Sequence, residues 1–137
     1  MSSKQSSRLI AIVDDDKSVQ TALQDLIESA GLSTVCFGSA EEFLNSGTQD
    51  EAGCLIADIR MPGMSGIELQ AKLKSDRCRI PIIFITAHGD ARMRIQAMRD
   101  GAVEFLTKPF DNAVLLETVY AAVVDHPEIS GLRNTNQ

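Results

Sequence analysis

Five short apolar runs recur along the chain, and helical stretches separate them. The runs are Leu9–Val13, Ser33–Phe37, Cys54–Ala57, Ile82–Ile85 and Val103–Leu106. The first, third and fourth runs are apolar without alternation, which is typical of strands buried on both faces of a parallel sheet. Strands that alternate with helices form an α/β domain with helices on both faces of the sheet. We therefore predict a (βα)5 doubly wound domain around a five-stranded parallel sheet.

Helix start and stop signals lie between these runs. An apolar stripe predicts a helix over Val19–Ala30, with Gly31 as its end. Ser39 and Ser65 each stand three residues before a glutamate, a pattern that predicts capping boxes. Two aspartates are expected to cap the last two helices: Asp90 and Asp111. The inward positions expected in the last helix are Val114, Leu115, Thr118, Val119 and Ala122.

Length and composition restrict the class of protein. The chain of 137 residues fits one domain, which we place over residues 8–126, with a disordered leader over 1–7 and a tail or the start of a linker over 127–137. The net charge of -6 argues against binding of nucleic acid by this chain. No apolar stretch approaches the roughly 20 residues of a membrane span. The 3 cysteines form no metal or disulfide pattern, so we expect reduced thiols and a cytoplasmic protein.

Polar residues follow four of the predicted strands. The first strand leads into Asp14-Asp15-Asp16, the third into Asp58, the fourth into Thr86 and the fifth into Lys108. In doubly wound sheets, ligands bind outside the carboxyl ends of the strands. Crowded carboxylates repel one another unless a cation neutralises them, and oxygen ligands with retained water suit Mg²⁺. Asp16 is expected only to cap the first helix.

This set of groups indicates phosphoryl chemistry. A carboxylate can attack phosphorus to form an aspartyl phosphate, and the transfer needs mainly positioning and neutralisation of charge. Asp58 is the best candidate for the nucleophile because it ends the central strand, between the other groups. Mg²⁺, the Lys108 ammonium and the Thr86 hydroxyl would stabilise the phosphoryl oxygens.

Four motifs in this order resemble those of bacterial response-regulator receiver domains over about residues 7–126. They are Ile12-Val13-Asp14-Asp15-Asp16, Ala57-Asp58-Ile59-Arg60-Met61-Pro62-Gly63-Met64-Ser65-Gly66, Ile85-Thr86-Ala87-His88-Gly89 and Phe105-Leu106-Thr107-Lys108-Pro109-Phe110. The second and third motifs resemble the FixJ-like subfamily in particular. The resemblance implies a flavodoxin-like strand order, 2-1-3-4-5, and a two-component signalling domain that is not an enzyme but catalyses its own phosphorylation and dephosphorylation.

The resemblance also implies a role for each matching residue. Asp58 would be the phosphoacceptor, and Thr86 and Lys108 would contact the phosphoryl group. Thr86 and Phe105 would form the conformational switch, and the bond between Lys108 and Pro109 would be cis. Mg²⁺, or Mn²⁺ in its place, would be held by the following groups: Asp14, Asp15, Asp58 and the backbone carbonyl of Arg60.

The implied partners are proteins of a phosphorelay. The phosphoryl group would come from a sensor histidine kinase, a phosphotransfer protein or a small phosphodonor. Phosphorylation would alter the face formed by the helix over 91–99, the strand at Phe105 and the last helix, and so promote a homodimer or target binding in transcription regulation. FixJ-like proteins usually carry a DNA-binding domain, which either follows residue 137 or is absent from a receiver that stands alone.

A haloacid-dehalogenase-like phosphatase is the alternative reading. Asp14-x-Asp16-x-Ser18 after an apolar strand also resembles the nucleophile motif of those enzymes, with Asp14 as the nucleophile. The chain is short for an enzyme with a cap domain, and Asp58 would have no role in that scheme.

Overall fold

The computed structural model describes residues 9–87 and 90–124. Strands and α-helices alternate over this part of the chain in the predicted (βα)5 pattern. The strands are β1 (Leu9–Val13), β2 (Ser33–Phe37), β3 (Cys54–Ala57), β4 (Ile82–Thr86) and β5 (Glu104–Thr107). The helices are α1 (Lys17–Ser29), α2 (Ala40–Ser46), α3 (Gly66–Ser75), α4 (Ala91–Arg99) and α5 (Asn112–Val124), with a 3-10 turn, η2 (Thr48–Asp50). All strand pairs are parallel and lie in the order β2-β1-β3-β4-β5, which confirms the predicted fold and strand order.

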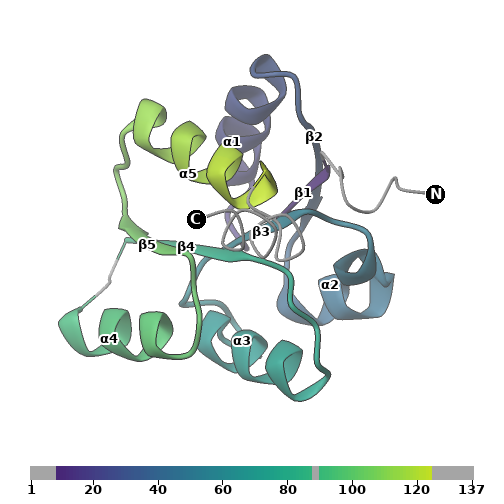
Figure 1. Cartoon of the computed structure of the whole chain (residues 1–137), viewed down its shortest axis with the longest axis vertical. Helices are drawn as coiled ribbons and strands as arrows, with labels where there is room; N and C mark the ends of the chain where they lie inside the picture. The colour runs from purple at the N-terminus through teal and green to yellow at the C-terminus, as the bar shows by residue number, and fades with distance from the viewer. Residues whose placement is uncertain (1–8, 88–89, 125–137) are drawn as a thin grey trace, which may run out of the picture.

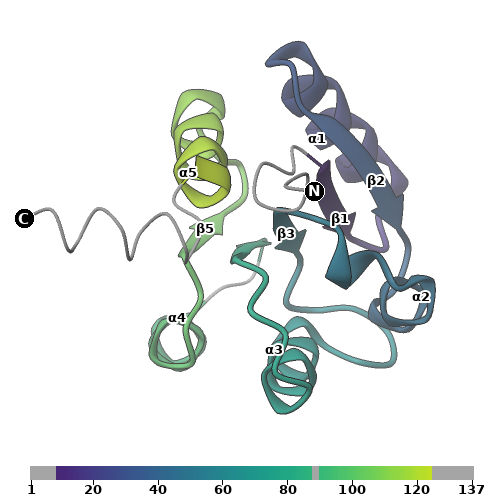
Figure 2. The ribbon, with the colours of Figure 1, turned by 45° about the vertical axis from the view of Figure 1, so that its right-hand side comes forward.

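The sheet separates two apolar cores. Helices α1 and α5 cover one face, and α2, α3 and α4 cover the other (Figure 1). Alternate residues of β1 face opposite cores, so that Ile12 packs toward α1 and α5 while Val13 packs toward α2 and α3. The same separation is visible from a second direction (Figure 2). Burial on both faces explains why the central strands are apolar without alternation.

Local hydrogen bonds account for the helix starts. Asp16 caps α1 by accepting from Ser18 N at 2.9 Å, as predicted. Ser65 forms a full capping box with Glu68. At α2 the expected box is only half formed: Ser39 caps the helix, but the Glu42 carboxylate accepts from Gly38 N at 2.9 Å. The glutamate therefore orders the turn before the cap.

The last helix buries a narrower stripe than the sequence suggested. Leu115, Val119 and Ala122 are buried, whereas Val114 is 42% exposed and its expected inward position is wrong. Burial at steps of three and four residues leaves Val114 to one side of the contact with the sheet.

Among the described helices, none is long and apolar enough to cross a membrane. The expected leader over 1–7 and the tail over 127–137 lie outside the described residues.

Helix α3 begins against the end of β3. Gly66 N donates to Ile59 O at 2.8 Å, which brings the first turn of α3 onto the backbone that follows β3. A Cβ atom at Gly66 would lie 2.3 Å from Asp58 O and 3.0 Å from Ile59 Cα. Because both atoms belong to the backbone, neither can rotate away. Gly66 therefore sets how closely α3 approaches the segment that carries Asp58.

We expect Gly66→Ala to destabilise the protein by roughly 1–3 kcal/mol, because the added methyl group forces backbone apart. Urea unfolding measures the change. Gly38→Ala is the matched control, since its Cβ would meet only Glu42 Oε1 at an ordinary 3.7 Å. Equal stability of the two variants would contradict the close approach at Gly66.

Candidate functional site

Three predicted site residues stand one position beyond the carboxyl ends of their strands. Asp14 N donates to Phe37 O at 3.1 Å, Asp58 N to Val13 O at 3.1 Å, and Lys108 N to Thr86 O at 2.9 Å. Each bond extends a parallel ladder by one residue, so the backbone of each group is fixed by the sheet. The sheet thus brings Asp14, Asp58 and Lys108 together although they are far apart in sequence.

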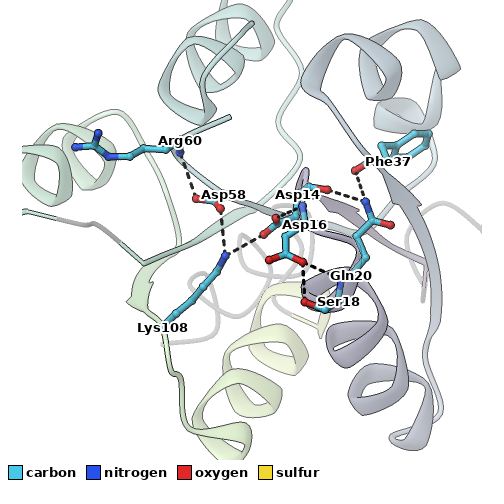
Figure 3. Close-up of polar contacts among 8 residues, drawn as sticks. All are labelled: Asp14, Asp16, Ser18, Gln20, Phe37, Asp58, Arg60 and Lys108. Atoms are coloured by element: carbon cyan, nitrogen blue, oxygen red, sulfur yellow. Dashed lines mark hydrogen bonds and ion pairs between the residues drawn. The ribbon is translucent and has the colours of Figure 1, made fainter. Parts of the chain in front are cut away.

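The Lys108 ammonium lies between two buried carboxylates (Figure 3). Its Nζ atom is 3.2 Å from Asp14 Oδ2 and 3.2 Å from Asp58 Oδ2. The other oxygens of the pair accept backbone N–H groups: Asp14 Oδ1 from Asp16 N at 2.9 Å, and Asp58 Oδ1 from Arg60 N at 3.2 Å. Charge-assisted bonds of this kind hold both carboxylates in one orientation.

Burial and charge act in opposite directions on these groups. Burial raises the pKa of Asp14, and the hydrogen bond from Asp16 N and the charge of Lys108 offset this only in part. Burial alone would lower the pKa of Lys108, but the charges and hydrogen bonds of Asp14 and Asp58 outweigh it and raise that pKa. Lys108 is therefore held as a cation, while its surroundings make ionisation of Asp14 harder.

The cluster has the donor set of a site for a hard divalent cation. One carboxylate oxygen from each of Asp14, Asp15 and Asp58 lies within 4.8 Å of the others. Three carboxylates and one ammonium leave a formal charge of -2, which one divalent ion would balance. Asp15 is exposed, so the cluster opens to solvent on its side. The Arg60 side chain extends away from the carboxylates (Figure 3), so only the backbone of Arg60 is placed to take part.

The two expected switch residues lie on neighbouring strands. Thr86 ends β4 and is fully buried, next to Thr107 at the end of β5. Phe105 on β5 is 3% exposed, and its ring centroid lies 6.4 Å from that of Phe84. The Phe105 ring is thus already packed inward in this structure. The peptide bond between Lys108 and Pro109 is cis.

Two residues that support the site were not identified from the sequence. Gln20 is 7% exposed, and its Nε2 atom donates to Asp14 O at 2.6 Å and to Phe37 O at 3.3 Å. It ties α1 to the ends of β1 and β2. The sequence pattern contained a clue to its role. Gln20 lies on the buried stripe of α1 with Leu23 and Ile27, and a polar side chain there needs a buried hydrogen-bond partner. Gly66 is part of the second family motif, but its close contact with the backbone of Asp58 and Ile59 was not predicted.

Comparison with known proteins agrees with this geometry. The family model of the response regulator receiver domain matches residues 10–120. The response regulator protein TodT of Pseudomonas putida is 48% identical over 120 residues, which cover 88% of this chain and 53% of TodT. The structure of the response regulator StyR superposes with a TM-score of 0.82 at 44% identity, covering 93% of this chain and 65% of that one. The crystal structure of FixJ-N gives a TM-score of 0.77 at 39% identity, covering 84% and 92%.

A flavodoxin-like parallel sheet with an acidic cluster at its carboxyl edge defines a doubly wound α/β protein with its site at the strand ends. The chain belongs to the response regulator receiver domain family, in agreement with the resemblance to FixJ-like proteins. It spans about half the length of the curated relatives it matches. The phosphatase reading with Asp14 as nucleophile is set aside, because Asp16 serves as a helix cap and Asp58 lies within the cluster.

We expect Asp14→Asn to raise the midpoint of thermal unfolding at pH 7 without divalent ions. A raised pKa means that the folded protein holds the Asp14 proton more tightly than the unfolded chain does. Stability is therefore lost as the pH rises from the ordinary pKa of an aspartate through the raised one, and the benefit of asparagine should shrink on acidification. Thermal melts across this range measure the effect.

The exposed Asp25 supplies a control, since Asp25→Asn makes the same change in net charge away from the cluster. A melting point for Asp14→Asn at or below that of the parent at pH 7 would show that the Lys108 ion pair outweighs the burial of Asp14.

Proposed function

We propose that this chain is a phosphorylation switch in which Asp58 accepts a phosphoryl group from a sensor histidine kinase, a phosphotransfer protein or a small phosphodonor. The observation that carries the proposal is the convergence of Lys108 and the Asp14 carboxylate on Asp58 at the sheet edge. Asp58 is preferred to Asp14 as the acceptor because its side chain is 10% exposed against 3%.

The proposed step is an in-line displacement at phosphorus. An Asp58 oxygen forms the new P–O bond, and the bond from phosphorus to the histidine nitrogen, or to the oxygen of a small donor, breaks and leaves its electron pair on the departing group. Lys108 already contacts Asp58 Oδ2 and would pair with the phosphoryl oxygens as charge builds up on them. The Thr86 hydroxyl would donate to one of these oxygens.

Mg²⁺ or Mn²⁺ fits the donor set of the cluster. Asp14, Asp15, Asp58 and the Arg60 carbonyl would hold the ion, which would neutralise the charge of the transferred group. The -2 formal charge of the cluster supports this assignment. The chain would then promote its own phosphorylation and dephosphorylation without turning over a separate substrate.

The proposed output surface is the face of α4, β5 and α5. These helices carry exposed apolar side chains: Ile95 at 56% and Met98 at 36% on α4, and Val114 at 42% on α5. Phosphorylation would draw Thr86 toward Asp58, and Phe105 and α4 would adjust to that movement. A second copy of the chain or a target protein would bind the altered face, and this binding would regulate transcription. The receiver domain would cover residues 8–126 of a cytoplasmic protein, with an output domain after residue 137 or in a separate partner.

We expect millimolar Mg²⁺ to raise the thermal unfolding midpoint. Binding to the folded state alone stabilises by about 1.4 kcal/mol at a concentration ten times the Kd. Calorimetry in Mg²⁺ and in a potassium salt of equal ionic strength separates binding from screening. Asp15→Asn should weaken the response without loss of the buried Asp14–Lys108 pair, and an identical response of parent and variant would exclude Asp15 as a ligand.

Asp58→Asn should abolish labelling by acetyl phosphate in Mg²⁺, because the amide is a poor nucleophile. Intact-mass spectrometry detects the added phosphoryl group. Asp25→Asn should be labelled as the parent is. If Asp58→Asn is labelled fully while Asp14→Asn or Asp15→Asn is not, the acceptor lies at another aspartate.

Thr86→Ala should accept phosphate on Asp58 but respond weakly, because the hydrogen bond made only with the phosphoryl group is lost. Size-exclusion chromatography with beryllofluoride measures self-association in the parent and the variant. Lys108→Ala should likewise accept phosphate on Asp58 but show weak self-association. Full dimerisation of Thr86→Ala would disprove the relay through Thr86 and Phe105.

A further inference from the structure

A cavity of about 420 Å³ opens at the amino edge of the sheet, opposite the carboxylates. It lies where β4 and β5 begin, between α3 and α5, and its apolar wall includes Leu73, Ile80, Val103 and Ala122. The volume is within the roughly 300–1,000 Å³ usual for pockets that bind small molecules. The phosphoryl chemistry proposed above makes no use of this cavity.

The charges at the cavity mouth favour an anion. Lys74 and Arg79 line it, and neither makes an ion pair with a carboxylate among the described residues. The neighbouring Lys72, in contrast, pairs with Asp76 at 3.4 Å. Asp100 is the acidic member of the lining, so the lining carries a formal +1 on a chain of net charge -6; of the two carboxylates that act on Cys78 from outside the lining, Asp76 is paired with Lys72, which leaves Asp50. An arginine fork matches a carboxylate well.

We propose that this cavity is a binding site for a small carboxylate with an apolar body about the size of one ring. The apolar body would lie against Leu73, Ile80 and Val103, and the carboxylate would meet Arg79 and Lys74 at the mouth. An apolar pocket with a few convergent polar groups is the usual form of such a site.

The cavity also borders the C-terminal end of α4. Asp100 and Gly101 follow that helix directly and line the cavity together with Gln70. Gln70 is 3% exposed, and its Nε2 atom donates to Ala97 O at 3.0 Å. Ala97 is the fully buried residue of α4, so this bond holds the helix where it packs most closely on the core. A ligand that fits the cavity as it stands would favour this position of α4.

The regulatory part of the inference rests on the proposed function, whereas binding does not. If phosphorylation shifts α4, a carboxylate in the cavity opposes the shift. Because a ligand changes an equilibrium only through its different affinity for the two states, phosphorylation must weaken carboxylate binding by the same factor.

Cysteine labelling tests binding without phosphorylation. Cys78 lines the cavity and is half-buried, while the half-buried Cys36 lies on β2 away from it. Burial raises the pKa of Cys54 to about 12, so that thiol should stay unlabelled in the folded protein. We expect millimolar benzoate to slow iodoacetamide labelling of Cys78 at least about threefold and to leave Cys36 unchanged, as followed by peptide mass spectrometry.

Matched ligands and variants identify the source of any protection. Benzylamine and benzyl alcohol should protect Cys78 much less than benzoate. Arg79→Ala combined with Lys74→Ala should remove the benzoate effect, and Lys72→Ala should keep it. Equal protection by benzyl alcohol, equal slowing at Cys36 or no protection by benzoate would overturn the proposal.

Other occupants of the cavity would also be revealed. Labelling of Cys78 that slows with protein concentration, and not with benzoate, would assign the cavity to a second copy of the chain. Faster labelling of the double variant Ile129→Ser and Leu132→Ser, with no benzoate effect in the parent, would assign it to the chain's own residues after α5. Either result would overturn the carboxylate site.

Beryllofluoride tests the regulatory part. Benzoate should reduce beryllofluoride-dependent self-association of the parent at least about twofold and have no effect on the variant lacking Lys74 and Arg79. Protection of Cys78 by benzoate in Asp58→Asn would uphold the site even if that aspartate were not the phosphoacceptor. Self-association that is unchanged by benzoate, despite protection of Cys78, would overturn the coupling to α4.

Discussion

The repulsion among carboxylates at the carboxyl edge of the sheet is the constraint on which this molecule depends. The parallel ladders place the backbones of Asp14 and Asp58 side by side, so their carboxylates can move apart only by rotation of the side chains. Lys108, 50 residues from Asp58 and 94 from Asp14 in sequence, places its ammonium between them. Adding or removing charge at this cluster therefore changes both the stability of the fold and the chemistry of the site.

The supporting contacts make this edge rigid. Gln20 fixes the backbone of Asp14 from α1, and the missing side chain at Gly66 lets α3 approach the backbone of Asp58. These residues bear no charge and touch no reacting group. They hold the backbones of Asp14 and Asp58 in place. A change of charge at the cluster is therefore expected to move other parts of the molecule.

Helix α4 is the element best suited to such movement. It buries Ala97 fully and Met93 in part against the core, and two side chains bond it to backbone: Gln70 to Ala97 O, and Arg94 to Phe105 O at 2.9 Å. Few apolar contacts and bonds near the surface are typical of segments that open or shift at low cost in free energy. One end of the helix adjoins the cavity at the amino edge, and Arg94 joins the helix to β5 at Phe105, which pairs with Phe84 of β4.

The spacing of apolar residues and the positions of helix-capping residues in the sequence determined most of the architecture. Apolar runs without alternation specify buried parallel strands, and residues such as Asp16, Ser65 and Asp90 mark helix starts through bonds within their own turns. The sequence also indicated which groups meet, since Asp14, Asp58 and Lys108 each follow a strand and parallel strands end at one edge. Membership of the receiver domain family followed from the motifs that contain these residues.

Only the tertiary structure decided the contacts that depend on packing between distant segments. The half-formed box at Ser39, the exposure of Val114 and the inward position of Phe105 reflect the space left by neighbouring elements, which periodicity does not encode. The same holds for the burial that raises the pKa of Asp14 and for the backbone contact at Gly66. Local sequence patterns indicate which secondary structure a segment prefers. The features above arise from contacts between segments that meet only after the sheet has formed.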